Sequence, residues 1–184
     1  MAETTVRHGE SGGATRRDVL DVVTWSAVAI GAGTMVWPLI SSMNPSADVL
    51  ALSSTEVDVS QVPEGAGITV MWRGRPTFVR HRTPAEIEEA VNTPLSALKD
   101  PQTDAERVHP GKEAYLIVGG NCTHLGCVPL GNKTTDDRGE FGGWFCPCHG
   151  SHYDTSGRIR KGPAPLNLPV PEYVFTTDTV VRIG

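Results

Sequence analysis

The longest uninterrupted apolar stretch lies near the start of the chain. Residues 22–40 read VVTWSAVAIGAGTMVWPLI, nineteen residues without a charge. At about 1.5 Å per residue, a helix of this length roughly spans a hydrocarbon core about 30 Å thick. Trp25 and Trp37 lie near its two ends, where indole rings favour the membrane interface. We therefore predict a transmembrane helix over residues 19–40 rather than a buried core helix, because no other stretch of comparable length is available to pack around it.

The pattern changes after this stretch. Residues 41–54 are mostly small and polar, which predicts a flexible hinge. Beyond them, apolar residues alternate with polar ones, as expected of strands in antiparallel sheets. The predicted strands lie around residues 57–59 and 68–72, over 77–82 and 114–118, and in a closing hairpin over 173–184. The sequence therefore predicts a mainly β domain over residues 55–184, preceded by one transmembrane helix.

One segment inside this β domain follows the helical period instead. Apolar residues recur at helical spacing from Ile87 to Leu98, and glutamates occupy the first turns. We predict a short helix over residues 84–98, whose second half is weakened by Pro94. The polar residues 100–112 are predicted to form a loop.

A polar tail, residues 1–18, precedes the apolar stretch and ends near Arg16 and Arg17. Two adjacent arginines at this place suit the positive-inside rule, with the N-terminus in the cytoplasm, and also match a twin-arginine export signal. Small residues at 49–51 would be the cleavage point of such a signal. Because the apolar stretch is longer than the usual signal core of about 7–15 residues, we expect it to be retained as an anchor.

Composition and charge narrow the choice of partner. The chain of 184 residues carries a net charge of −5 at pH 7, which argues against nucleic acid, because phosphate binding needs a surplus of Lys and Arg. Residues 41–184 carry 13 basic and 17 acidic groups, so most of the negative charge lies in the exported part. A local basic cluster of Arg73, Arg75, Arg80 and Arg82 is interpreted as a solvated strand face rather than a binding patch.

All four cysteines fall in two short segments, CTHLGC at residues 122–127 and CPCHGS at residues 146–151. Each segment offers one thiolate and one imidazole at close spacing. The pair therefore supplies the two-Cys, two-His donor set of a Rieske [2Fe-2S] centre. The two remaining cysteines, one in each segment, could form a disulfide that ties the segments together.

Two other readings use the same residues. Zinc also accepts Cys and His ligands, but it more usually employs Cys-x-x-Cys pairs and would leave two cysteines without a role. Two disulfides would be natural in an exported domain, but they would leave His124 and His149 unexplained. The donor set therefore favours the iron–sulfur centre. His152 is not at a ligand position, and we expect it to be exposed.

The segments CTHLGC and CPCHGSHYD resemble the cluster loops of the Rieske iron–sulfur subunits of cytochrome bc complexes. The Gly-Pro-Ala-Pro sequence at residues 162–165 resembles the third loop that covers the cluster in this family. The resemblance extends to the twin arginines, to the helix ending in WPLI, to NPSADV in the hinge and to GRIRKGPAP. It implies an antiparallel-sheet Rieske domain with a small cluster-binding subdomain at about residues 119–166.

The resemblance also implies a role for individual residues. Cys122 and Cys146 would hold one iron of a single [2Fe-2S] cluster, and His124 and His149 would hold the other. Cys127 would be bonded to Cys148 in a disulfide. The hydroxyls of Ser151 and Tyr153 would donate hydrogen bonds to cluster and ligand sulfur and raise the reduction potential. Leu125 would shield the cluster from water.

The function implied is that of an electron-transfer subunit of a membrane quinol:cytochrome c oxidoreductase, ubiquinol-cytochrome c reductase. His149, with His124 as an alternate, would accept the proton of ubiquinol while the cluster takes one electron. The implied partners are membrane lipid, cytochrome b, which holds the quinol pocket, and a c-type cytochrome, within a dimeric complex. The anchor would lie in the bacterial cytoplasmic membrane, and the head would be periplasmic and move on residues 41–54.

Three alternatives share parts of the pattern. The first is the Rieske subunit of a plastoquinol-oxidising complex, and the second is the small Rieske subunit of an arsenite oxidase, which can also carry a twin-arginine signal. The third is a zinc-stabilised, membrane-anchored interaction domain without a redox role. The hinge sequence and the long insertion over residues 84–112 favour the ubiquinol-oxidising type.

Overall fold

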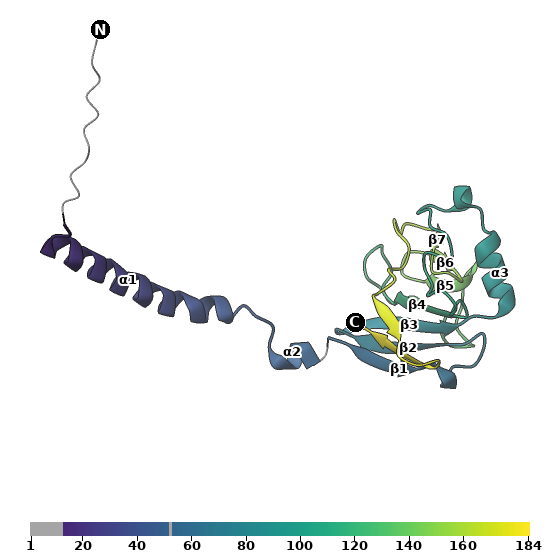
Figure 1. Ribbon diagram of the computed structural model, residues 1–184. Coiled ribbons are helices and arrows are strands. Elements are labelled where there is room, and N and C mark those ends of the chain that lie inside the picture. Colours follow the sequence, from purple (N-terminus) through teal and green to yellow (C-terminus); the bar gives the residue numbers. More distant parts are fainter. Residues whose placement is uncertain (1–12, 52) are drawn as a thin grey trace, which may run out of the picture. The chain divides into compact units, whose positions relative to one another are not determined.

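The computed structural model describes residues 13–51 and 53–184 (Figure 1). The chain forms two compact units that divide between Ser46 and Ala47. The first twelve positions of the predicted N-terminal tail lie outside the described residues, and so does position 52 of the predicted hinge.

The first unit contains one long helix, α1 (Arg16–Ser41), of 26 residues. It begins at a capping box, in which the Thr15 hydroxyl accepts the backbone N–H of Asp18 and the Asp18 carboxylate accepts that of Thr15. This cap explains why the helix begins at Arg16 rather than at residue 19. None of its residues is buried, and the mean hydropathy of its most apolar part is 1.6. By length and composition, α1 can cross a membrane.

A short helix, α2 (Ala47–Ala51), lies inside the segment predicted to be a flexible hinge. The composition of residues 41–54 contains no signal strong enough to predict it. A helix of five residues is marginal on its own, because nucleation fixes several backbone dihedrals and so short a helix forms too few hydrogen bonds to offset that cost. The segment therefore combines irregular backbone with one short helical turn.

The second unit, Ala47–Gly184, is called the head below. Its described residues form three antiparallel sheets of three strands each, which confirms the predicted mainly β fold (Figure 1). The first sheet contains β1 (Thr55–Asp58), β9 (Val180–Ile183) and β8 (Tyr173–Phe175) in that order. The second contains β2 (Gly67–Trp72), β3 (Arg75–His81) and β4 (Tyr115–Gly119). The third contains β5 (Gly142–Cys146), β6 (Ser151–Asp154) and β7 (Ile159–Lys161). Two 3-10 turns, Val59–Gln61 and Leu95–Ala97, and the helix α3 (Pro84–Asn92) complete the regular structure of the described part of this unit.

Apolar residues on the two faces of the second sheet enter two different cores. Val79 and Ile117, which are paired across β3 and β4, pack with residues of the first sheet. Phe78 and Val118, the next pair along the strands, pack with residues of the third sheet. Since successive side chains of a strand point to opposite faces, β3 and β4 are buried on both sides.

This double burial overturns one expectation. Arg80 and Arg82 are 0% and 1% exposed, so they do not belong to a solvated strand face, whereas Arg73 and Arg75 are exposed. Arg82 forms a bidentate pair with Asp104, with distances of 2.6 and 3.1 Å. A charge pattern along a strand predicts exposure only if one face of the sheet meets water, and here neither face of β3 does.

The helix α3 (Pro84–Asn92) is shorter than the predicted 84–98. Its start is fixed by a capping box between Thr83 and Glu86 and by a proline in the first turn. Its end follows from Pro94, because the residue before a proline is pushed out of the helical region. Thr93 accordingly has extended backbone, with φ −68° and ψ 117°. The polar segment 100–112 has no helix or strand, as predicted.

Candidate metal centre

Three loops of the third sheet and its neighbours build the candidate site. The first, residues 120–127, follows β4 and is closed by a hydrogen bond from the Cys122 N–H to the Cys127 carbonyl, at 2.7 Å. The second connects β5 to β6 and is closed by a bond of 3.0 Å from the Gly150 N–H to the Cys146 carbonyl. The turn at Gly150 requires a φ of +71°, which favours glycine. The third loop, residues 162–166, follows β7.

The four predicted sulfur positions come together, but their exposure differs. Cys122 and Cys146 are buried, at 3% and 2% exposure, whereas Cys127 is half-buried and Cys148 is exposed. The sulfurs of Cys127, Cys146 and Cys148 lie within 4.8 Å of one another. All four cysteines are thiols in the structure, and the Cys127–Cys148 disulfide stays a prediction that their proximity permits.

The two predicted imidazole ligands also meet. The ring centroids of His124 and His149 lie 4.7 Å apart, with the rings at 85° to each other. His149 is exposed and His124 is half-buried, so the imidazoles lie on the solvent side of the two buried thiols. Leu125, the predicted shield, is 71% exposed beside them.

The environments of the two buried thiols push their pKa values apart. Burial acts to raise the pKa of Cys122, but hydrogen bonds from Tyr153 and from the backbone of His124 bring it below its ordinary value. Burial raises the pKa of Cys146 to about 12. A metal cation between the sulfurs would offset this desolvation and hold both groups as thiolates. The buried thiols and the adjacent imidazoles therefore fit a mixed Cys/His metal or iron–sulfur centre.

The predicted hydroxyl groups lie behind the thiols. Tyr153, on β6, is fully buried, and its hydroxyl donates to the Cys122 sulfur at 3.3 Å. Burial beside this thiol raises the pKa of Tyr153, so the phenol keeps the proton that it donates. The Ser151 hydroxyl accepts the N–H of Ala164 at 3.2 Å. Its hydrogen bond to the Cys122 thiol also helps to lower the pKa of that thiol. Ser151 thus links the second loop to the third.

Thr123 is a site residue that was not predicted from the sequence. Its hydroxyl donates to the carbonyl of Leu166 at 2.6 Å and lies 3.3 Å from the Tyr153 hydroxyl, and its backbone N–H donates to that same hydroxyl at 3.2 Å. It therefore joins the first loop to the third and orients Tyr153. Its position between the expected ligands Cys122 and His124 is the one signal that points to it.

His152 is half-buried, which corrects the expectation of an exposed side chain. Its ring lies 4.7 Å from that of Phe145, its partner across β5 and β6. Its Nδ1 accepts the backbone N–H of Glu140 at 3.2 Å. The side chain thus belongs to the packing of the third sheet.

Sequence comparisons agree with this geometry. A family profile described as "Rieske [2Fe-2S] domain" matches residues 57–173, and one described as "Ubiquitinol-cytochrome C reductase Fe-S subunit TAT signal" matches residues 6–46. The ubiquinol-cytochrome c reductase iron-sulfur subunit of Rhodospirillum rubrum is 58% identical over 185 residues, covering 100% of both chains. That of Rickettsia felis is 55% identical over 92% of this chain and 93% of its own.

A mitochondrial relative and a solved structure extend the likeness. The Rieske subunit of the cytochrome b-c1 complex of Neurospora crassa is 54% identical over 85% of this chain and 64% of its own. A chain of a structure titled "Hyperthermophilic respiratory Complex III" is 21% identical, covers 87% of this chain and 98% of its own, and has a TM-score of 0.52. At that identity the structural likeness speaks for the fold alone.

Proposed function

This chain belongs to the Rieske [2Fe-2S] family, among the iron–sulfur subunits of ubiquinol-cytochrome c reductase, and from this we propose that it carries one electron from ubiquinol to a c-type cytochrome. The observation that carries the proposal is the layered site, with two buried thiols beneath two neighbouring imidazoles at the surface. Cys122, Cys146, His124 and His149 would hold the centre. When bound, such a centre supplies a one-electron acceptor.

His149 is the side chain best placed to receive the proton of the quinol. It is exposed, so a quinol hydroxyl can approach the ring and donate a hydrogen bond to it. Imidazole is the ligand type that can then hold the proton, because its second nitrogen stays free when the first is bound to a metal. His124 offers a second imidazole, 4.7 Å away, as an alternate.

The proposed assembly follows the family. The head would dock alternately on cytochrome b, which holds the quinol, and on the c-type cytochrome, within a dimeric complex. The anchor α1 would lie in the bacterial cytoplasmic membrane with its N-terminus in the cytoplasm and the head in the periplasm; the twin arginines support this orientation. A tether over residues 41–54 raises the effective concentration of the head at both docking sites.

The decisive experiment is low-temperature EPR with metal analysis on the purified complex after mild reduction. We expect two irons per chain, no zinc and the signal typical of mixed Cys/His ligation. The Cys146→Ser variant should lose this signal. The matched variant Cys148→Ser should keep it and lose only stability, because Cys148 is the proposed disulfide partner. A zinc-containing, EPR-silent protein would refute the proposal, and loss of the signal in Cys148→Ser alone would reverse the ligand assignment.

Head movement has a separate test. Replacing Asp48 by Pro, inside α2, stiffens and redirects the tether, whereas Asp48→Ala removes the same carboxylate and leaves the backbone free. We expect slower reduction of the c-type cytochrome in the proline variant, with an unchanged EPR signal. Equal rates in both variants would show that electron delivery does not need a mobile tether.

A further inference from the structure

Buried arginine side chains form a layer between α3 and the third sheet, called the arginine layer below. Among the described residues, four arginines are at most 2% exposed: Arg80, Arg82, Arg107 and Arg158. Three of them are paired with a carboxylate. These pairs are Arg80 with Glu86, Arg82 with Asp104 and Arg158 with Asp154. Because a buried charge is costly unless it is paired, such pairing is the expected arrangement.

Arg107 is different. Its Nε donates to the carbonyl of Ser156 and its Nη2 to that of Leu168, each at 2.6 Å, and its Nη1 donates to the side-chain amide of Gln102. Among the residues that the structure describes, no carboxylate accepts a hydrogen bond from it. Burial lowers its pKa only to about 10, so the group is charged at neutral pH. Arg107 is therefore a buried cation whose hydrogen bonds all go to neutral oxygens, while the carboxylates of Asp154, Asp100 and Asp104 act on it electrostatically without such a bond.

Arg107 contacts residues that adjoin the first and third loops of the candidate site. A Cβ on Gly157 would lie 3.2 Å from Arg107 Nη2 and 3.3 Å from Val118 Cγ1, so the guanidinium and Val118 flank the same glycine. Val118 is four residues before Cys122, a span of at most about 14 Å even in a fully extended chain. Leu168, whose carbonyl Arg107 binds, follows Leu166, whose carbonyl accepts the Thr123 hydroxyl.

We propose that the positive charge of Arg107, which is hydrogen-bonded to no carboxylate, raises the reduction potential of the centre. The proposal rests on the ligand set proposed above. Reduction by the quinol adds one electron and therefore one negative charge at the centre, and no bond to Arg107 forms or breaks. A cation behind the loops stabilises the reduced form more than the oxidised form. Water and salt screen such a buried charge only weakly.

The negative charge of Asp100 should have the opposite effect on the reduction potential. This half-buried carboxylate acts electrostatically on Arg107 without a hydrogen bond to it, and its Oδ2 accepts the backbone N–H of Asn167 at 2.9 Å. An asparagine at this position keeps an acceptor for that N–H and removes the negative charge. If the net charge of this layer sets the potential, Asp100→Asn should raise it.

The test is an EPR-monitored redox titration of the intact complex with four variants. Arg107→Gln should shift the midpoint potential downward, by a several-fold decrease in the equilibrium constant for reduction. Arg107→Lys loses the two-pronged contact but keeps the charge, and it should stay nearer to the wild type. Asp100→Asn should shift the potential upward. The exposed control Arg75→Gln should leave it unchanged, because solvent screens that charge.

Different results separate the two proposals. Equal downward shifts in the Gln and Lys variants, or an unchanged potential in both Arg107→Gln and Asp100→Asn, would reduce Arg107 to a structural clamp and overturn the inference. If Arg107→Gln does not accumulate, the sign of the Asp100→Asn shift decides alone. A wild-type complex without the mixed-ligand signal would instead refute the proposed function.

Discussion

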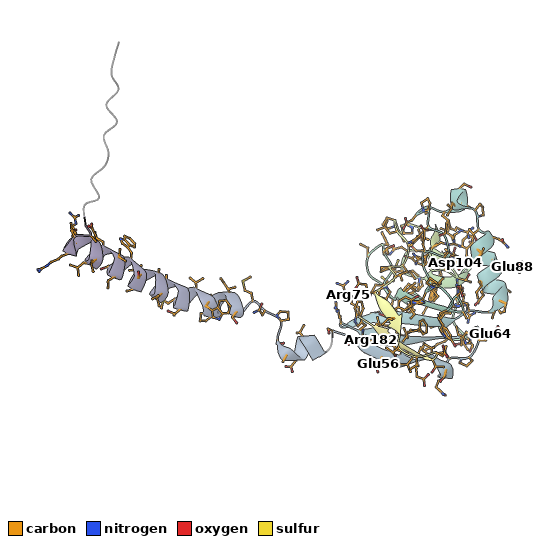
Figure 2. The ribbon with its side chains drawn as sticks, viewed as in Figure 1. Glu56, Glu64, Arg75, Glu88, Asp104 and Arg182 are labelled. Carbon is orange, nitrogen blue, oxygen red and sulfur yellow. The ribbon has the colours of Figure 1, made fainter. Side chains whose placement is uncertain are left out.

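The loop end of the head and the arginine layer behind it treat polar groups in opposite ways. At the loop end, His149 and Cys148 are exposed, and the ring centroids of His149 and His124 lie 4.7 Å apart in an edge-to-face contact. In the arginine layer, Arg82 and Asp104 are 1% and 4% exposed and bind each other through two hydrogen bonds. Asp104, which is buried, and Glu64, which is exposed, are both labelled in Figure 2.

The difference follows from what each region has to do. A group that exchanges a proton with a substrate has to be reachable, so its polar atoms stay open to a partner. A group that holds loops in place gains most from burial, because hydrogen bonds and ion pairs in a low-dielectric interior are strong and costly to break. The proposed proton acceptor is thus exposed at the surface, whereas the paired charges are buried.

The largest effect is expected from breaking the buried layer. Asp104→Asn leaves the Arg82 cation buried without a counter-ion and weakens the bond from the Ser156 hydroxyl. We expect the free energy of unfolding of the head to fall by about 3–5 kcal/mol, measured by denaturant titration. The matched control is Asp178→Asn, which breaks the exposed pair with Lys112 and should cost at most about 1 kcal/mol. Similar losses in both variants would erase the contrast between the two regions.

The Arg82–Asp104 pair should also make the free energy of unfolding depend on pH. Burial acts to raise the pKa of Asp104, but hydrogen bonds from Arg82 and Ser156 bring it below the ordinary value of 3.8. A carboxyl group with a depressed folded-state pKa stabilises the protein above its unfolded-state pKa, and this stabilisation is lost as the pH falls through the folded-state pKa. Acid unfolding should therefore be less steep in Asp104→Asn than in the wild type. Identical pH profiles would contradict the depressed pKa.

A smaller effect is expected where the two regions meet. Tyr153→Phe removes the hydroxyl that donates to the Cys122 sulfur and keeps the buried ring. Because such a bond favours electron density on sulfur, its loss should lower the midpoint potential, by about 59 mV for a tenfold change in equilibrium constant. Tyr115→Phe, on β4, is the control and should leave the potential unchanged. An unchanged potential in Tyr153→Phe would remove the assigned role of this bond.

The smallest effect on stability is expected at the outer surface. Leu125→Ala alters a side chain that is 71% exposed, so the free energy of unfolding should change by no more than about 0.5 kcal/mol. If Leu125 shields the centre, the variant should nevertheless lose its iron faster to a chelator. Equal rates of iron loss in the variant and the wild type would show that Leu125 has no shielding role.

The candidate site was largely predictable because its chemistry is local. The Cys and His spacing in residues 122–127 and 146–151 names the donor types directly. In the structure the two predicted thiols are buried and the two predicted imidazoles are neighbours, and their role as ligands stays a prediction. Thr123 escaped prediction, since a hydroxyl in a loop has many local partners, and its bond to Leu166 joins segments 43 residues apart.

The fold was predictable in type but not in its limits. Alternation of apolar and polar residues identified strands, yet the 84–98 helix ends at Asn92, because the backbone restriction imposed by Pro94 outweighs the apolar spacing. The prediction of a solvated basic strand face was wrong for a different reason. Alternation along β3 says which residues share a face, and only the other sheets decide whether water reaches that face.

By itself, the sequence determined the apolar anchor, the β character of the head, the donor set and the family, since each depends on residue types at short spacing. The tertiary structure decided which thiols are buried, which imidazole meets solvent and which arginines lose water. Burial is a property of the assembled sheets, because the desolvation of a side chain depends on residues far away in the chain. The charge of Arg107 is visible in the sequence, but the absence of a bonded carboxylate among its described neighbours emerges only from the fold.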